Sequence, residues 1–328
     1  MTAAKAPSFV QQLLDDGVIR SSDATLTPLT GGVSSEIYRV LDGDRQFVVK
    51  RALAKLKVSA DWYADTSRNA MEQAYIRYVG NLLPDAVPAI THANPESGYF
   101  AMEFLDGFAN WKEDMLAGHF DLDIASAAGQ TLGKIHACSW NDTEVAKQFN
   151  ATENFDQLRI DPYIRAAAVK HPALAKQLLA EAQRLRLSRQ CLMHGDYSPK
   201  NMLHRQGRLV ILDCEVASYG DAAFDLAFLL NHLLLKGLYH GPQQTDLPRL
   251  FEQTIKTYVT EMGALADQVL NNTTRLLPML LLARVDGKSP VEYLTANKQA
   301  MVRRYAVSRI LNPHNDLVTL ASDWYSQL

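Results

Sequence analysis

The sequence predicts an α+β protein with two lobes, in which a small antiparallel β-sheet lobe precedes a larger, mainly helical lobe. The 328 residues exceed the size at which a single hydrophobic core usually stops growing. The first third of the chain has short apolar segments typical of strands, and the remainder has apolar residues at helical spacing. We therefore expect a first lobe over residues 1–105 and a second lobe over residues 106–328.

The first lobe is expected to contain a hairpin, a helix and a further strand. Residues 36–40 and 46–50 have strand character and flank Asp42-Gly43, a pair that favours a tight hairpin turn. Apolar residues in segment 71–82 follow the spacing of an amphipathic helix. Residues 98–104 form the next predicted strand, and the Asp106-Gly107 turn that follows marks the junction between the lobes.

The second lobe is expected to be helical around one short hairpin. Helical periodicity covers residues 122–139, and another helix is expected over residues 172–189 with a proline in its first turn. The segments 202–204 and 209–212 flank Gln206-Gly207 and predict a hairpin. Residues 224–235 then return to a helical pattern.

The composition excludes several classes of protein. Hydrophobic residues make up 47% of the chain and charged residues 21%, which is typical of a globular protein. The net charge of −3 provides no basic surface for nucleic acid or an anionic membrane. The apolar runs are too short or too interrupted for a membrane span, and the first residues lack the pattern of a secretory signal.

The cysteines favour a reducing compartment. Three cysteines are an odd number, and none is arranged as a CxxC pair. We expect them to be buried thiols and the protein to be cytoplasmic, without a nucleic-acid or membrane partner. The sequence leaves the oligomeric state open.

Three neighbouring motifs in the second lobe carry the chemistry: HGDYSPKN over residues 194–201, LVILDCE over residues 209–215 and GDAAFDLA over residues 220–227. Asp196 and Asn201 lie five residues apart on a predicted loop, and Asp213 follows an apolar strand. Such oxygen groups can surround a polyphosphate and its metal, and they suit Mg²⁺. Each residue taken singly is more often an ordinary loop residue, so the prediction depends on their occurrence together.

With these motifs the chain resembles the aminoglycoside phosphotransferase and choline kinase superfamily, whose members have a protein-kinase-like fold and phosphorylate small molecules. The resemblance implies that Asp196 is the base or orienting group for a substrate hydroxyl. It also implies that Asn201 and Asp213 bind magnesium. Glu215 stands where protein kinases have the glycine of their D-F-G segment. Related small-molecule kinases are similar in having an acidic residue there, so Glu215 is a further candidate metal ligand.

Two residues are expected to support the loop that contains Asp196. Asp225 resembles a buried family residue whose carboxylate accepts hydrogen bonds from backbone N–H groups of the catalytic loop. His194 is expected to serve the same loop by packing and hydrogen bonding.

The resemblance places the ATP-binding groups in the first lobe. A turn directly before the first predicted strand would approach the phosphates through its backbone N–H groups; it contains Gly31, Gly32 and Ser34. Lys50 at the end of a strand would bind the α- and β-phosphates, and Glu72 on the following helix would pair with Lys50. The backbone from Glu103 to Leu105 would contact the adenine ring.

The predicted reaction is transfer of a phosphoryl group from Mg-ATP to a hydroxyl group of a small molecule. The chain contains no GxxxxGK[ST] motif, which excludes a P-loop kinase. Only 12 positions separate Asp213 from Asp225, which leaves no room for the activation segment on which protein kinases dock a peptide. A nucleotide-binding pseudokinase and a non-catalytic scaffold remain as alternatives.

The sequence leaves the acceptor open. Polycationic aminoglycosides would require local acidic side chains, and choline would require an aromatic cage; candidates for the cage are Trp111, Tyr197 and Tyr219. Arg284 is similar in place to arginines that methylthioribose kinases set against their sugar substrate, although a helix-capping turn explains its position equally well. Arg284 and Tyr219 are therefore the candidate substrate residues, and a phosphorylated, carboxylated or sugar-like acceptor is a hypothesis.

Overall fold

The computed structural model describes residues 9–29, 35–52, 68–94 and 98–328. The chain divides into two compact units, Met1–Gly107 and Phe108–Leu328. The division falls next to the boundary expected from the sequence, at the Asp106-Gly107 turn. The predicted turn of Gly31, Gly32 and Ser34 lies outside the described residues.

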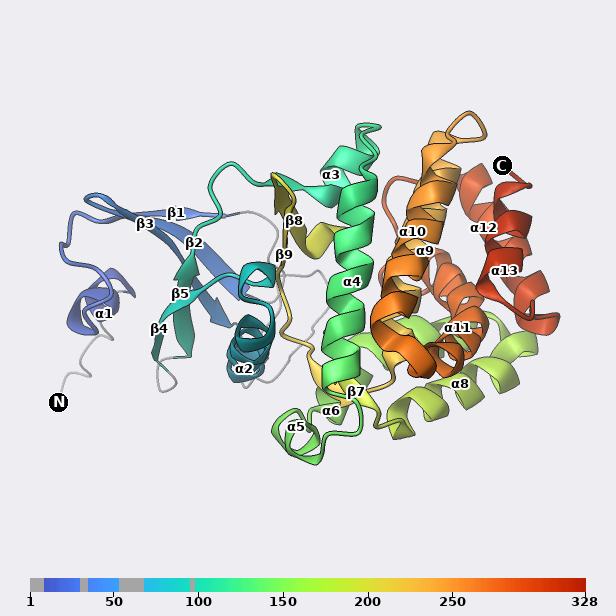
Figure 1. Ribbon diagram of the computed structural model, residues 1–328, viewed down its shortest axis with the longest axis horizontal. Coiled ribbons are helices and arrows are strands. Elements are labelled where there is room, and N and C mark those ends of the chain that lie inside the picture. Colours follow the sequence, from blue (N-terminus) through green and yellow to red (C-terminus); the bar gives the residue numbers. More distant parts are fainter. Residues whose placement is uncertain (1–8, 30–34, 53–67, 95–97) are drawn as a thin grey trace. The chain divides into compact units, whose positions relative to one another are not determined.

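Unit 1 is built on a five-stranded antiparallel sheet in the order β1-β2-β3-β5-β4 (Figure 1). The strands are β1 (Thr25–Pro28), β2 (Ser35–Asp42), β3 (Arg45–Ala52), β4 (Ile90–Asn94) and β5 (Tyr99–Glu103). Helices α1 (Phe9–Asp15) and α2 (Arg68–Leu82) and the short 3₁₀ turn Pro84–Ala86 complete the described part. The predicted helix and the predicted strand before the junction are confirmed as α2 and β5.

The β2–β3 hairpin is confirmed, with its turn one residue later than expected. Asp42 still pairs with Arg45, so the two-residue turn is Gly43-Asp44 rather than Asp42-Gly43. Gly43 has φ +66°, as the first central position of a type II′ turn requires. The sequence did not indicate β1 and β4. Both are edge strands with mostly exposed or half-buried side chains, so they lack the alternation that reveals a strand.

The two faces of this sheet bury different chemistry. On one face Val49 and Ala101 form a hydrophobic core with Leu13 of α1. Successive residues of a strand point to opposite faces, so Lys50 points to the other face. There it meets Glu72 of α2. Strand alternation thus places a lysine and an acid in a buried layer without disturbing the apolar layer.

Unit 2 consists mainly of helices. They are α3 (Trp111–Leu116), α4 (Leu122–Cys138), α5 (Thr143–Gln148), α6 (Thr152–Phe155), a π-helical segment η2 (Asp156–Arg165), α7 (Ala166–Lys170), α8 (Ala175–Leu187), α9 (Ala222–His240), α10 (Asp246–Met262), α11 (Ala266–Asp286), α12 (Ala296–Leu311) and α13 (Leu317–Tyr325). Short 3₁₀ turns cover Pro172–Leu174, Pro199–Asn201 and Gly263–Leu265. The predicted helices over 122–139 and 172–189 correspond to α4 and to the Pro172 turn with α8.

Short strands position the loops of unit 2. β7 (Cys191–Met193) pairs with β10 (Ser218–Gly220), and β8 (Met202–Arg205) pairs with both β6 (Ala109–Asn110) and β9 (Arg208–Ile211). The predicted hairpin at Gln206-Gly207 is confirmed, because both turn residues have positive φ. The sequence did not indicate strand β7, since three residues are too few to show a period.

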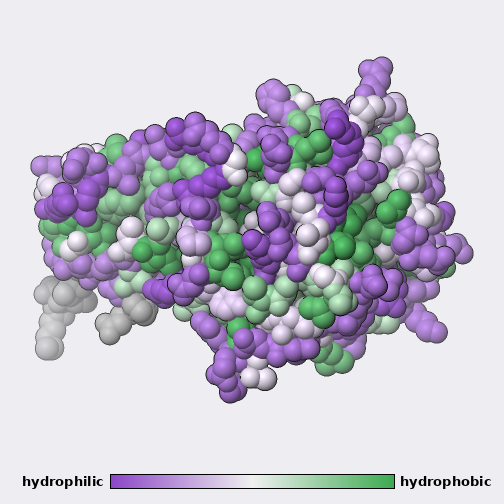
Figure 2. All heavy atoms as spheres, viewed as in Figure 1, coloured by the Kyte–Doolittle hydropathy of each residue, from purple (hydrophilic) through white to green (hydrophobic). Residues whose placement is uncertain are grey.

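Helix α9 is the central element of unit 2. Every residue from Ala222 to Leu238 is buried, and the helix contacts α4, α10, α11 and α13. Asp221 caps its N-terminus by accepting a hydrogen bond from Ala223 N, and Gly241 with φ +90° ends it. A helix buried on all sides is expected to be mainly apolar around its circumference; the polar side chains buried in α9 are Asp225, Asn231, His232 and Lys236. The surface shown in Figure 2 is by contrast mostly hydrophilic, with smaller hydrophobic areas between.

The length of α9 corrects one expectation. The sequence indicated a helix over residues 224–235 that was too short for a bilayer, but α9 runs over Ala222–His240. Among the described residues it is the one helix long and apolar enough to cross a membrane, and 94% of its apolar window is buried inside the fold. That burial is typical of a core helix. A second correction concerns the cysteines: Cys191 and Cys214 are buried as expected, whereas Cys138 is exposed.

Helices α4 and α10 run side by side and pack closely (Figure 1). A Cβ atom at Gly129 of α4 would overlap the carbonyl oxygen of Thr254 in α10, and one at Gly133 would lie 2.7 Å from Glu261 Cβ. The absence of side chains at these two positions allows the helices to approach.

We expect Gly129→Ala to destabilise unit 2 by about 1–3 kcal/mol, because the added methyl group cannot be accommodated without separating the two helices. Urea denaturation of the purified protein measures this change. The matched control is Gly80→Ala in α2, where the nearest atom to the new Cβ, Val87 Cγ2, lies 3.4 Å away. That change should leave stability unaltered or raise it by up to about 1 kcal/mol. Equal effects of both substitutions would contradict the packing argument.

Candidate active site

The site in unit 2 is built around the loop His194–Asn201, which connects β7 to β8. The carboxylate of Asp225, in the first turn of α9, is fully buried beneath this loop. Its Oδ2 accepts a hydrogen bond from His194 N at 2.6 Å, and its Oδ1 accepts one from Gly195 N at 2.9 Å. The structure therefore places Asp225 where the family resemblance implied. One carboxyl group thus accepts hydrogen bonds from two backbone donors that have no other secondary structure to pair with.

Hydrogen bonds inside the loop fix its shape. Asp196 N donates to His194 Nδ1 at 3.1 Å, so Nδ1 is an acceptor and the ring proton resides on Nε2. His194 Nε2 then donates to Leu212 O at 3.1 Å. Burial lowers the pKa of His194, against the opposing charges of Asp225, Asp196 and Asp213. A neutral, internally bonded imidazole fits the expected supporting role of His194.

The same contacts join the loop to the segment that follows β9. Asn201 O accepts a hydrogen bond from Leu212 N at 2.8 Å. Gly195 has φ +77°, and a Cβ atom there would lie 2.6 Å from Val216 O. Only glycine combines this backbone conformation with so close an approach. Residues 194–196 and 212–216 therefore form one compact arrangement.

Asp196 is held by a residue that no motif in the sequence indicates. Arg159 Nη2 lies 3.1 Å from Asp196 Oδ2, and Arg159 Nε donates to Gly195 O at 2.5 Å. Burial opposes the charge of Arg159, but the carboxylates of Asp196, Glu215 and Asp213 raise its pKa above the usual range. Arg159 belongs to the π-helical segment η2, a rare geometry that is frequent at functional sites. No local motif marks it, so only the fold reveals the contact.

The three predicted metal ligands all offer oxygen atoms, and two of them, Asp213 and Glu215, lie near enough to act on Arg159. Asn201 Nδ2 donates to Asp196 O at 3.0 Å, which leaves the amide oxygen as the group that can bind a cation. Asp213 has φ +61°, an uncommon conformation for a non-glycine residue that Asp tolerates better than most. The charges of Asp213 and Glu215 both act on Arg159. One amide oxygen and two carboxylates form a donor set that suits Mg²⁺.

This donor set is not a ready-made cage. Within residues 9–29, 35–52, 68–94 and 98–328, no group of three or more His, Cys, Asp or Glu side chains is arranged to hold a metal ion. Mg²⁺ usually keeps several waters and binds through one or two carboxylates together with substrate phosphates. The residues present fit such a partly hydrated ion.

Unit 1 contains the predicted lysine and glutamate as a buried pair. Lys50 Nζ lies 2.8 Å from Glu72 Oε1, and their side chains are 4% and 3% exposed. The pairing expected from order and spacing is therefore observed. Glu103 ends β5 with its N–H donated to Ala89 O, and Leu105 follows the strand half-buried. Their proposed contacts with ATP stay predictions.

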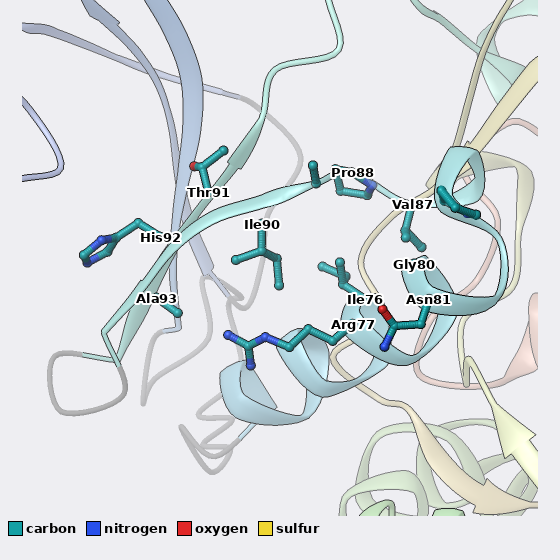
Figure 3. Close-up of a pocket in the computed structure, with 12 residues that line it drawn as sticks. Ile76, Arg77, Gly80, Asn81, Val87, Pro88, Ile90, Thr91, His92 and Ala93 are labelled. Carbon is teal, nitrogen blue, oxygen red and sulfur yellow. The ribbon is translucent and has the colours of Figure 1, made fainter.

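A pocket of about 660 Å³ lies between α2 and the strand β4 in unit 1 (Figure 3). Its wall is mainly apolar and includes Ile76, Val87, Pro88 and Ile90. None of the predicted site residues that the structure describes lines it. The pocket therefore adds no residue to the predicted site.

The candidate aromatic cage is not present. Tyr197 is fully buried and donates to Ala128 O at 2.8 Å, and Trp111 is 1% exposed. Tyr219 is buried on β10 and its hydroxyl contacts Ser139 O at 3.0 Å and Gln190 O at 2.9 Å. These three rings belong to the core, and Tyr219 is accounted for as a structural residue. Arg284 lies at the end of α11, where its Nη1 donates to Ser289 Oγ at 3.0 Å and Tyr163 Oη at 3.3 Å.

Comparison with known proteins decides the family. A model of the phosphotransferase enzyme family (APH) matches residues 25–254, which is most of the chain. The chain belongs to this family. The match spans both the strands of unit 1 and the catalytic-type loop of unit 2, and it confirms the resemblance drawn from the motifs.

Curated relatives of this phosphotransferase-family chain include methylthioribose kinases. The Erwinia tasmaniensis protein is 26% identical over 231 residues, which cover 61% of this chain and 57% of the relative. The Bacillus pumilus protein is 24% identical over 271 residues, covering 73% of this chain and 67% of the relative. The chain thus spans less than two thirds of the length of the Erwinia protein.

Solved structures confirm the predicted α+β, kinase-like fold class. An amicoumacin kinase in complex with AMP-PNP, Ca²⁺ and its ligand superposes with a TM-score of 0.57 at 16% identity, covering 93% of this chain and 95% of that one. A choline kinase from Cryptosporidium parvum gives a TM-score of 0.55 at 12% identity, with coverages of 92% and 94%. At these identities the likeness concerns the fold alone.

The Asp225 anchor generates a direct prediction. We expect Asp225→Ala to lower the free energy of unfolding by about 2–4 kcal/mol, since it leaves the buried N–H groups of His194 and Gly195 without an acceptor. Asp225→Asn retains one acceptor oxygen and should lie between the wild type and Asp225→Ala. Urea denaturation with the three proteins measures the order. An alanine variant as stable as the wild type would show that water replaces the carboxylate.

Proposed function

We propose that this chain transfers the γ-phosphoryl group of ATP to a hydroxyl group of a small molecule, with Asp196 as the group that orients and deprotonates the hydroxyl. One observation carries the proposal: the Asp225-anchored loop holds Asp196, Asn201 and the Asp213–Glu215 segment in one compact arrangement. Family membership supports it, and methylthioribose kinases among the relatives support a small hydroxylated acceptor.

The proposed reaction balances without a covalent enzyme intermediate. The acceptor oxygen forms a bond to the γ-phosphorus while the bond from that phosphorus to the β,γ-bridging oxygen breaks. ADP leaves, and the hydroxyl proton passes to the Asp196 carboxylate. Such a transfer requires positioning and charge neutralisation more than reactive side chains. Arg159 meets the first requirement because its two contacts fix both the Asp196 carboxylate and the Gly195 carbonyl.

The metal in this proposal is Mg²⁺, held by Asn201, Asp213 and Glu215. When bound, Mg²⁺ neutralises charge on the phosphate oxygens. The donor chemistry and the shared influence of Asp213 and Glu215 on Arg159 support this assignment. The left-handed backbone at Asp213 also supports it, since non-glycine residues in that conformation cluster at functional sites.

Unit 1 would bind the nucleotide. Lys50, aligned by Glu72, would contact the α- and β-phosphates, and the backbone of Glu103 and Leu105 would contact adenine. The buried Lys50–Glu72 ion pair supports these roles. Removing two charged groups from water carries a desolvation penalty, so the pair adds little to stability and a functional role accounts for it better. The cysteine pattern favours a reaction in the cytoplasm.

We expect Asp196→Asn to lower kcat by about a hundredfold or more, because the amide cannot accept the hydroxyl proton. Affinity for Mg-AMP-PNP should stay within about twofold, since Asp196 serves the acceptor and not the nucleotide. The measurements are ADP formation with an identified acceptor and calorimetric titration with Mg-AMP-PNP. The control is Asp44→Asn in the exposed β2–β3 turn. Unchanged turnover in Asp196→Asn would remove this residue from the mechanism. A wild type that binds Mg-ATP without any turnover would favour a pseudokinase.

We expect Asp213→Asn to weaken Mg-AMP-PNP binding by about tenfold or more through loss of an anionic metal ligand. Asparagine tolerates the left-handed backbone at this position, so the change tests charge rather than folding. Titrations with and without Mg²⁺ separate metal-dependent from metal-independent binding of the nucleotide. Without the metal, the wild type and Asp213→Asn should bind AMP-PNP equally. If the variant keeps its metal-dependent affinity, the ion is bound elsewhere.

A further inference from the structure

Helix α9 contains a buried lysine that the proposed mechanism does not use. Lys236 is 1% exposed, in the last turns of the central helix. In the part of the chain that the structure describes, no carboxylate lies within ion-pair distance of its amino group. Its Nζ lies 5.4 Å from the centroid of the Tyr293 ring. A buried ammonium group without a carboxylate is costly for a folded protein, so its presence requires an explanation.

The neighbours of Lys236 are also cationic. We define the cationic cluster as Lys112, Lys200, Lys236 and Arg284. All four lower the pKa of one imidazole, His232, in addition to the larger effect of its burial. Burial, together with the charges of Lys112 and Arg284, lowers the pKa of Lys236 to about 7, against the opposing effect of Glu292 and Glu113. Such a concentration of like charge is unfavourable unless an anion joins it.

The nearest acids do not balance the cluster. Glu292 pairs with Lys112 at 2.7 Å, and its side chain is 67% exposed to solvent. Among the described residues, Arg284 bonds neutral groups only, namely the Ser289 carbonyl and hydroxyl and the Tyr163 hydroxyl. Lys200 lies within ion-pair distance of Asp196. Within the described residues, Lys236 and Arg284 are therefore the two cations of the cluster without a carboxylate pair, and Glu292 and Glu113 act on Lys236 from a distance.

Two further buried polar atoms near Lys236, one of them on Arg284 itself, lack a hydrogen-bonding partner within the described part of the chain. Tyr293 Oη and Arg284 Nε are buried, and neither has a hydrogen-bonding partner among the residues that the structure describes. Burial raises the pKa of Tyr293, so its hydroxyl stays protonated and is a donor. Buried polar groups are normally satisfied. Three unmatched donors, from Lys236, Arg284 and Tyr293, call for an acceptor group that the described residues do not supply.

The cluster adjoins the catalytic-type loop. Lys200 Nζ lies 3.9 Å from Asp196 Oδ2 and also acts on His232. Arg284 contacts Tyr163, which lies in the same π-helical segment as Arg159, the partner of Asp196. All the residues in these contacts belong to unit 2. These contacts make unit 2 the place where one acceptor would meet both Asp196 and the unmatched donors.

We infer that the acceptor is an anionic hydroxy compound, a sugar acid or hydroxy acid or the phosphate ester of a polyol, whose anionic group binds Lys236, Arg284 and Tyr293. This inference rests on the proposed function and names the substrate class of the same site. A carboxylate or a phosphate ester offers the acceptor oxygens that these donors lack. A polycationic aminoglycoside or a choline-type cation would instead be repelled by the cluster. The product is a phosphate ester that keeps the original anionic group.

The test uses compounds that differ only in charge. D-Gluconate, D-glucitol and 1-amino-1-deoxy-D-glucitol share one polyol chain and have an anionic, a neutral and a cationic end, and D-glucitol 6-phosphate adds the phosphate ester. D-Glycerate, glycerol and 3-amino-1,2-propanediol form a shorter series. Inorganic phosphate serves as the minimal probe. Thermal shift is measured with the full chain saturated with Mg-AMP-PNP, which occupies the nucleotide phosphate site, and ADP formation is measured with Mg-ATP.

We expect the anionic members to raise the unfolding temperature and the neutral and cationic members to leave it unchanged. Lys236→Met removes the charge at nearly constant length and should weaken anion binding at least tenfold, and Tyr293→Phe should weaken it about threefold, since it removes a single hydrogen bond. The matched control Lys147→Met, on a side chain 73% exposed, should leave binding unchanged. Tyr293→Phe keeps the test valid if Lys236→Met does not fold.

Several outcomes overturn the inference: no anion-dependent shift in either series or with phosphate, equal or stronger binding of the cationic members, or an anion shift that Lys236→Met and Tyr293→Phe retain. A response to D-gluconate or D-glycerate alone assigns the site to carboxylates, and a response to D-glucitol 6-phosphate alone assigns it to phosphate esters. Phosphorylation of a cationic acceptor would remove this inference and leave the proposed function intact. Lys236-dependent anion binding without turnover of any acceptor would count against the proposed function and would leave an anion-binding site that serves no phosphoryl acceptor.

Discussion

The burial of one carboxylate determines most of what unit 2 can do. Asp225 lies in a buried, mainly apolar helix, and a carboxyl group in such a place is stable only when its oxygens are hydrogen-bonded. Its oxygens accept hydrogen bonds from the main-chain N–H groups of His194 and Gly195, and His136 Nε2 lies 3.5 Å from Oδ2. Folding the core and shaping the loop are therefore one event. Because Asp196 follows these two residues directly, its position is set by the packing of α9.

The fold was predictable wherever a segment had a clear period or a specific turn. The β2–β3 and β8–β9 hairpins combine strand-like sequence with glycine-containing turns, and both were found. The edge strands β1 and β4 and the three-residue strand β7 escaped because exposed or very short strands have no alternation to detect. The turn at Gly43-Asp44 was displaced by one residue, since the sequence does not indicate which residue of the Asp-Gly pair leaves the ladder first.

The site in unit 2 was predictable to the extent that its residues lie in three neighbouring motifs. His194, Asp196, Asn201, Asp213 and Asp225 occur within about thirty positions of sequence, and the fold joins them as the resemblance implied. Arg159 could not be found, because it reaches the loop from a π-helical segment with no recognisable pattern. Lys236 was hidden for another reason. In the run LLLK it reads as a solvated end of an apolar stretch, and only the surrounding helices show that it is buried.

Proton binding by the buried amino group of Lys236 is linked both to folding and to binding of an anionic acceptor. In the unfolded chain a lysine keeps its proton up to a pH near 10.5, whereas burial lowers the folded value to about 7. Folding therefore expels a proton between these limits, and the free energy of unfolding attributable to this group rises with pH across that window. An anion beside the same nitrogen favours the charged form and draws the proton back. Folding thus favours the neutral form of Lys236, and binding of an anionic acceptor favours the charged form. A rise in pH would therefore stabilise the unliganded protein and weaken its affinity for an anionic acceptor.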